Sequence, residues 1–129
     1  MEDVGITELA HKPLYTLSGG MRQNAYIAMA LAQETDYILL DEPTTYLDIA
    51  HQLELMRILR KLADSGKGIV TVMHDLPLAF DFSDTLTVMN NGGIIACGTP
   101  SELCNLPIIE DIFGVKIKQM QDDKYSYQY

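Results

Sequence analysis

A short apolar run that ends in two acids constrains this chain more than any other stretch. Residues 37–40 are a tyrosine and three aliphatic residues, Asp41 and Glu42 follow at once, and Pro43 prevents the strand from continuing. An unbroken apolar run predicts a strand buried on both faces, which is typical of a parallel sheet flanked by helices. Acids at the end of such a strand lie near the crevice where open α/β sheets bind ligands. Because isolated carboxylates are costly to desolvate, the pair indicates a functional site, and capping of the next helix is the alternative.

The segment after the acids predicts a helix. Asp48 is a good N-cap, apolar positions recur behind it at helical spacing over residues 49–63, and Gly66 lies where a helix commonly ends. The expected apolar stripe consists of Ile49, Leu53, Met56, Leu59 or Arg60, and Ala63.

A second apolar run, over residues 69–73, leads directly into His74. A strand, a helix and a strand of this length predict a right-handed parallel crossover, in which both strands end at the same edge of the sheet. We therefore expect His74 beside Asp41 and Glu42. A lone histidine is more often structural or solvated, but one beside two carboxylates at strand ends indicates function.

A serine and two glycines open the apolar segment that precedes this unit. Ser18 is a good N-cap, and Gly19 and Gly20 leave the first backbone N–H groups of a helix unobstructed. Residues 24–32 are apolar on nearly every side, which predicts a buried helix. The N–H groups and the positive dipole end of such a helix favour an anion, and an ordinary capped turn softened by glycine is the alternative.

Shorter elements are expected on both sides of this region. A weak helical stripe before Pro13 consists of Val4, Ile6, Leu9 and Ala10. The elements expected after His74 are a helix over 76–82, a strand over 85–89, a hairpin turn over 90–93 with its return strand over 94–97, a helix capped by Thr99, and a helix over 107–113. The tail from residue 116 predicts an edge strand or disorder.

The composition limits the classes of function. At 129 residues the chain is at most one domain, and its 47% hydrophobic and 21% charged residues are typical of a globular protein. A net charge of −9 argues against a nucleic-acid binder, which needs a basic face, but one nucleotide needs only a local site. Cys97 and Cys104 fit no metal spacing. Without a secretory signal or an apolar run of about 20 residues, a cytosolic location is expected.

Taken together, these motifs resemble a known family. The serine and glycines before the apolar helix, the run into Asp41 and Glu42, the polar loop after them, and His74 follow one another as in the second half of an ATP-binding-cassette (ABC) ATPase. Residues 28–33 and 41–48 are most similar to importers of iron-siderophore, haem or cobalamin type. The resemblance implies an α/β fold class, a partial P-loop NTPase fold in which parallel strands are flanked by helices, with a C-terminal hairpin and short helices.

The resemblance divides residues 1–129 into three parts of one partial domain. Residues 1–33 would be the end of the helical subdomain with the signature motif, residues 34–98 the core with the Walker B, D-loop and H-loop motifs, and residues 99–129 the C-terminal helices and tail. The phosphate loop G-x-x-x-x-G-K-[ST] occurs nowhere in the chain.

The resemblance also implies roles for single residues. Asp41 would be the Walker B carboxylate that orders Mg²⁺, Glu42 the general base for the attacking water, and His74 the switch histidine that bonds the γ-phosphate. Residues that would touch a nucleotide held mainly by a partner subunit, or signal across the dimer, are Ser18, Gly19, Gly20, Gln23 and Asp48. Met21 and Asn24 depart from the glutamine and arginine that siderophore importers usually carry there.

The function that the resemblance implies is that of the ATP-hydrolysing subunit of an ABC importer for iron siderophores or related metal chelates, with ATP and Mg²⁺ as cofactors. Its partners would be a second cassette, as in a homodimer, and membrane permease subunits that hold it at the inner face of the cell membrane; nucleic acid is not expected. Without the phosphate loop we expect the chain alone to be inactive. The alternatives are a non-catalytic fragment that pairs with an intact cassette, a soluble non-transport ABC ATPase, and a structural α/β domain with chance motifs.

Overall fold

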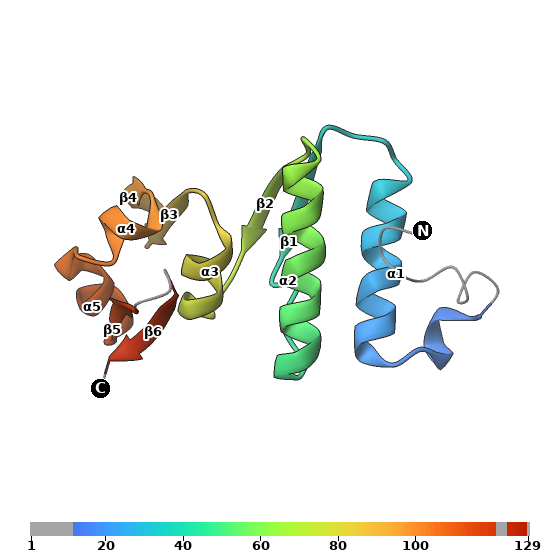
Figure 1. The fold of residues 1–129 in the computed structure, drawn as a ribbon, viewed down its shortest axis with the longest axis horizontal. Helices are drawn as coiled ribbons and strands as arrows, with labels where there is room; N and C mark the ends of the chain where they lie inside the picture. Colours follow the sequence, from blue (N-terminus) through green and yellow to red (C-terminus); the bar gives the residue numbers. More distant parts are fainter. Residues whose placement is uncertain (1–11, 121–123, 129) are drawn as a thin grey trace. The chain divides into compact units, whose positions relative to one another are not determined.

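The computed structural model of the chain describes residues 12–120 and 124–128. The chain forms two compact units, of which one runs through Met73 and the other begins at His74 (Figure 1). The helical stripe expected between Val4 and Ala10 lies outside the described residues. Within the described ranges, no helix has both the length and the apolar character that crossing a bilayer requires.

The first unit contains two parallel strands joined by a helix. Its elements are the 3₁₀ helix η3 (Leu14–Thr16), α1 (Gly19–Leu31), β1 (Tyr37–Asp41), α2 (Ile49–Asp64) and β2 (Gly68–Val72). β1 and β2 pair in parallel, from Tyr37 opposite Gly68 to Asp41 opposite Val72. The expected parallel pairing is therefore confirmed, and both strands end at the same edge of the sheet.

Local signals set the two ends of α2. Asp48 is the N-cap and accepts a hydrogen bond from the N–H of His51 at 3.0 Å. At the other end Gly66 has a φ of +101°, a left-handed conformation that favours glycine. The apolar stripe is only partly as expected, because Ile49 in the first turn is exposed. The buried positions are Leu55, Met56, Leu59 and Leu62.

The sheet formed by β1 and β2 is covered on one face only. Ile38 is 4% exposed, whereas its neighbour Leu39, which points to the opposite face, is 75% exposed. Leu39 pairs with Val70, which is also exposed on that face. The prediction that β1 is buried on both faces is therefore wrong. The helix between the strands lies along one face, as Figure 1 shows, and no described element of this unit covers the other.

Helix α1 is also less buried than the sequence predicts. Ile27 and Ala28 are buried, but Tyr26 and Met29 are exposed on other sides of the helix. Within the first unit α1 lies beside α2 rather than on the sheet (Figure 1). The prediction of a helix buried all round is wrong, because one neighbouring helix covers only one side of α1.

The second unit is built from short elements. They are α3 (Leu76–Phe82), β3 (Leu86–Asn90), β4 (Gly93–Gly98), α4 (Pro100–Leu103), α5 (Pro107–Phe113), β5 (Lys116–Gln119) and β6 (Tyr125–Gln128). β3 and β4 form the expected antiparallel hairpin, and Asn91 and Gly92 in its turn have φ values of +48° and +77°. Two left-handed residues are what a two-residue hairpin turn needs. β5 and β6 also pair antiparallel, so the tail forms strands.

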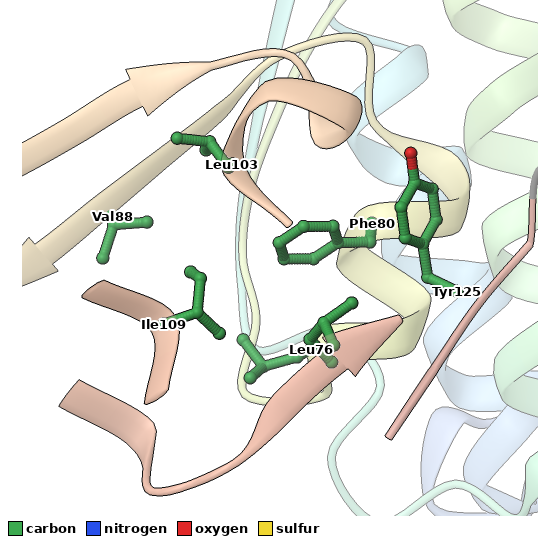
Figure 2. Close-up of a cluster of buried hydrophobic side chains, with 7 residues drawn as sticks. Leu76, Phe80, Val88, Leu103, Ile109 and Tyr125 are labelled. Carbon is green, nitrogen blue, oxygen red and sulfur yellow. The ribbon is translucent and has the colours of Figure 1, made fainter. Parts of the chain in front are cut away.

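The second unit has its own hydrophobic core. Its buried members are Leu76, Phe80, Val88, Leu103, Ile109, Ile117 and Tyr125, most of them labelled in Figure 2. The rings of Phe80 and Tyr125 lie 5.2 Å apart between centroids, a distance at which tilted aromatic pairs attract. The N–H of Tyr125 donates to the carboxylate of Asp81 at 2.7 Å, which ties β6 to α3. Packing and this hydrogen bond together hold the tail strands against the helix.

Candidate functional site

The start of α1 is an open helix N-terminus. Ser18 is the N-cap, and its hydroxyl oxygen accepts a hydrogen bond from the N–H of Met21 at 3.4 Å. Ser18 and Gly19 are exposed, whereas Gly20 is buried and Gln23, one turn further on, is half-buried. The expected cap is thus confirmed. Unpaired N–H groups and the dipole at this end give a local preference for an anion.

The loop before α2 lies against this helix start within the first unit. A Cβ built on Gly19 would lie 3.9 Å from both Leu47 Cδ2 and the carbonyl oxygen of Tyr46. A Cβ on Gly20 would lie only 2.5 Å from Cδ2 of His51. This contact between the loop and the helix start was not predicted from the sequence. The adjacent glycines at the start of α1 are a sequence signal for such a close approach.

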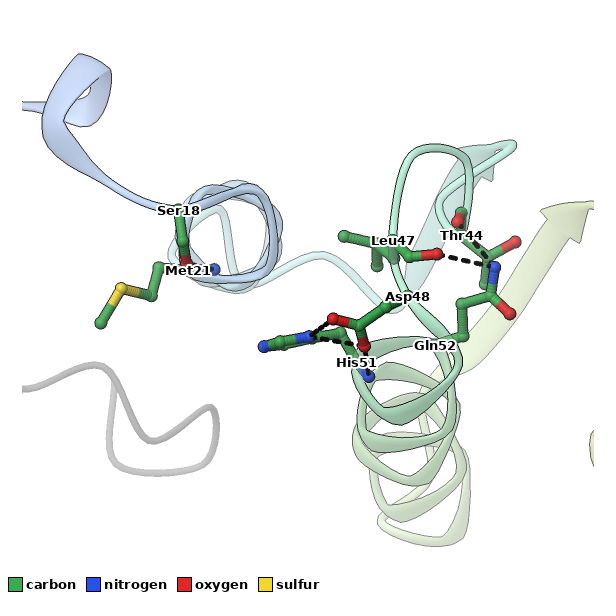
Figure 3. Close-up of polar contacts among 7 residues, drawn as sticks. All are labelled: Ser18, Met21, Thr44, Leu47, Asp48, His51 and Gln52. Atoms are coloured by element: carbon green, nitrogen blue, oxygen red, sulfur yellow. Dashed lines mark hydrogen bonds and ion pairs between the residues drawn. The ribbon is translucent and has the colours of Figure 1, made fainter.

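Asp48 and His51 form a hydrogen-bonded pair at the start of α2. Nδ1 of the imidazole lies 2.8 Å from each carboxylate oxygen. Dashed lines mark these contacts in Figure 3. The hydrogen bond from the backbone N–H of His51, followed by the one from its ring, holds the pKa of the Asp48 carboxyl below its usual value. Asp48 is therefore anionic at neutral pH, and it fixes the orientation of the imidazole.

Gln52 holds the loop between the acids and α2. Its side-chain amide donates to the carbonyl oxygens of Thr44 at 3.2 Å and Leu47 at 3.1 Å (Figure 3). Thr44 is itself buried. Sequence reasoning missed Gln52, although a long amide side chain one turn after an N-cap is well placed to reach back to the preceding loop. These bonds fix the path of the chain between β1 and α2.

The two acids lie at the end of β1, as expected. Asp41 is the last strand residue, and the N–H of Glu42 donates to the carbonyl oxygen of Val72 at 3.0 Å. Glu42 has a φ of +47°, an unfavourable conformation for a residue with a Cβ. The hydroxyl of Thr45 donates to the Glu42 carboxylate at 3.2 Å. A backbone held in an unfavourable conformation just after a strand end is common at functional sites.

His74 begins the second unit. It is exposed, and Asp75 behind it caps α3 by accepting the N–H of Leu78 at 3.0 Å. One residue, Met73, separates this histidine in the sequence from Val72, which pairs with Asp41. The position expected for His74, beside Asp41 and Glu42, stays a prediction.

The side chains at the end of β1 supply only some of the ligands that a Mg²⁺ ion needs. No group of three or more histidine, cysteine or acidic residues suited to a metal ion occurs among the residues described. Mg²⁺ commonly uses one or two carboxylates and completes its shell with water and substrate phosphates. Asp41, exposed at the strand end, fits that limited role, and the phosphates of a nucleotide would have to supply the remainder.

Comparisons with known proteins identify similar sequences. A family model described as ABC transporter matches residues 1–45. The chain is 45% identical over 123 residues to the ferric enterobactin transport ATP-binding protein FepC of Escherichia coli K12, covering 95% of this chain and 45% of FepC. It is 42% identical over 125 residues to the iron(3+)-hydroxamate import ATP-binding protein FhuC of Bacillus subtilis 168, covering 96% of this chain and 46% of FhuC. The chain thus spans about half the length of the curated relatives it matches.

A solved structure gives the same result for the fold. A putative metal-chelate type ABC transporter in an inward-facing conformation superposes with a TM-score of 0.82 at 26% identity, over 99% of this chain and 54% of that one. The expected fold class, an α/β and partial P-loop NTPase fold of the ABC ATPase kind, is therefore confirmed.

Proposed function

Because this chain corresponds to the C-terminal portion of an ABC transporter ATPase domain, we propose that it forms part of the ATP-hydrolysing subunit of an importer for iron siderophores or related metal chelates. The printed names of its relatives, a ferric enterobactin transporter and an iron(3+)-hydroxamate importer, support that substrate class. The observation that carries the proposal is the anchored acid pair, Asp41 and Glu42, at the end of a parallel strand.

In this proposal the acid pair and His74 act on the terminal phosphate of ATP. Phosphoryl transfer requires mainly that the reacting groups are positioned and that the charge on the phosphate is neutralised. Mg²⁺ would supply the charge neutralisation when it is bound. Asp41 would hold the ion, and Glu42 would take the proton of the attacking water. His74 bonds the γ-phosphate and the same water. The support for Glu42 is its fixed backbone and its hydrogen bond from Thr45.

The helix start of α1 serves a second nucleotide in this proposal. Ser18, Gly19 and Gly20 touch the γ-phosphate of ATP held by a partner cassette, with Gln23 one turn behind them. Asp48 lies in the loop that signals across that dimer. Supporting this, the loop of Asp48 and the helix start are neighbours in one unit. Permease subunits then hold the assembly at the inner face of the membrane.

The proposal includes inactivity of the chain by itself. A phosphate loop supplies the backbone cradle, the lysine and the hydroxyl ligand for the nucleotide, and no such motif occurs in this sequence. We expect no ATP turnover above background from the purified chain. Turnover that copurifies with the chain through several columns and disappears with Glu42→Gln would contradict this part of the proposal.

Transport by a chimera tests the proposal as a whole. The part of FepC that precedes the matched segment would be joined to this chain, and the chimera would be expressed in Escherichia coli that lacks FepC. We expect ferric enterobactin uptake to return with the chimera but not with the FepC part alone or with the Glu42→Gln chimera. A chimera that accumulates and binds ATP but restores no uptake would overturn the proposal.

A further inference from the structure

One side of the His51 imidazole is fixed by Asp48. Nδ1 lies 2.8 Å from both carboxylate oxygens, and the backbone N–H of the same histidine donates to one of them at 3.0 Å. These contacts join the ring, its own backbone and the carboxylate, so the ring has little freedom to rotate. The opposite edge of the ring therefore points in a defined direction.

That opposite edge lies against Gly20. A Cβ built on Gly20 would meet Cδ2 of His51 at 2.5 Å, Cγ at 3.1 Å and Nε2 at 3.2 Å. All three of the nearest atoms belong to this one imidazole. Gly20 has no positive φ, so its backbone conformation does not require glycine. The imidazole itself is thus what leaves no room for a side chain at this position.

A purely local role for His51 does not account for this fit. A histidine that only completed the cap of α2 would need Asp48 and nothing on another helix. Gly19, the adjacent glycine of α1, has its nearest neighbours at 3.9 Å and would accept a Cβ. The close approach is therefore specific to Gly20, and it links the first turn of α1 to the first turn of α2.

We propose that His51 is a positioning residue, which braces the helix start at residues 18–20 against the loop of Asp48 so that the two segments keep one relative placement. The catalytic consequence of this brace rests on the proposed function. Groups that orient a reacting phosphate lose effectiveness when they are displaced by about 1 Å. His51 touches neither phosphate nor water in this scheme, and it acts only through Gly20 and Asp48.

A double-mutant cycle on the full chain tests the contact itself. Gly20→Ala should lower the urea midpoint, Gly19→Ala should not, and most of the loss should disappear when Gly20→Ala is combined with His51→Ala. His51→Asn keeps a donor near the position of Nδ1 but lacks the ring, so it should relieve the Gly20→Ala loss as well. If Gly20→Ala lowers the urea midpoint equally in the presence of His51, His51→Ala and His51→Asn, or does not lower it at all, the proposal is overturned.

Nuclear magnetic resonance of the unaltered chain covers the case in which Gly20→Ala does not fold. A nuclear Overhauser effect between the Hδ2 proton of His51 and the α protons of Gly20 is expected in the folded chain. Absence of that effect, in a spectrum where other contacts between α1 and α2 are seen, would overturn the proposal without any variant.

Kinetics of the FepC chimera test the positioning role. His51→Ala and His51→Asn should each lower kcat by about 10-fold or more while KM for ATP changes much less, because the brace affects alignment more than binding. An active chimera whose kcat is unchanged by both substitutions would overturn the role of His51 and leave the proposed function intact. An inactive chimera would instead count against the proposed function, while the double-mutant cycle and the NMR contact still decide the brace.

Discussion

The ring of Tyr37 in β1 lies over Gly68, its partner in β2, so closely that Gly68 has no room for a Cβ. Gly68→Ala should therefore force the exposed ring out of its rotamer and lower the free energy of unfolding by about 1 kcal/mol. Urea unfolding followed by circular dichroism measures this. Gly93→Ala is the control, because a Cβ on that strand glycine would meet only one atom, at 3.7 Å. Equal effects of the two substitutions would contradict the close packing of Tyr37 on Gly68.

The exposed sheet face leads to a second prediction. Ile38→Ala should lower the free energy of unfolding by about 2–5 kcal/mol, because it empties a buried position. Leu39→Ala, one residue on, should change it by about 0.5 kcal/mol or less, because Leu39 is exposed. The two variants are compared in the same urea titrations. A loss for Leu39→Ala as large as that for Ile38→Ala would mean that both faces are covered.

Gln52 provides a third prediction. Gln52→Ala removes the donor to Thr44 and Leu47 and should lower the free energy of unfolding by about 0.5–1.5 kcal/mol, because two hydrogen bonds are lost while the carbonyl of Thr44 keeps the backbone N–H of Leu47 as a partner. Amide hydrogen exchange across residues 44–47 should become faster. Glu54→Ala, an exposed substitution in the same helix, is the control. Unchanged exchange in the Gln52 variant would show that the loop does not depend on these bonds.

The lowered pKa of Asp48 predicts an effect of pH. A carboxyl whose pKa is lower in the folded than in the unfolded chain stabilises the fold above its ordinary pKa, here 3.8, and this stabilisation is lost as the pH falls through the folded value. Asp48→Asn should thus unfold at lower urea than the unaltered chain at neutral pH, and the difference should disappear in strong acid. A difference that is constant with pH would show that the charge of Asp48 is not responsible.

Structural features that depend on a few neighbouring residues, such as helix ends and turns, were predicted well from the sequence. Asp48 and Gly66 bound α2, and Asn91 with Gly92 makes the hairpin turn, because caps and turns depend on the conformations of adjacent residues. The position of the acids also follows from local rules, because a proline at position 43 limits how far the strand can run, and β1 ends at Asp41 with Glu42 directly after it.

Burial and long-range contacts were predicted less well. Leu39 and Tyr26 are apolar and were expected inside, but whether they are covered depends on which elements lie next to them. The contact of His51 with Gly20 joins two helices, and no spacing in the sequence indicates it. Whether His74 lies beside the acids depends in the same way on contacts far apart in the sequence, and its position stays a prediction.

ATP hydrolysis by the FepC chimera, with Glu42 or with Glu42→Gln, tests the central claim most directly. A general base contributes about 10²–10⁴-fold to rate, so the substitution should lower kcat by that factor while equilibrium binding of ATP changes little. Hydrolysis at the unaltered rate, or a loss of ATP binding in proportion to the loss of kcat, would contradict the assignment of Glu42 as the base.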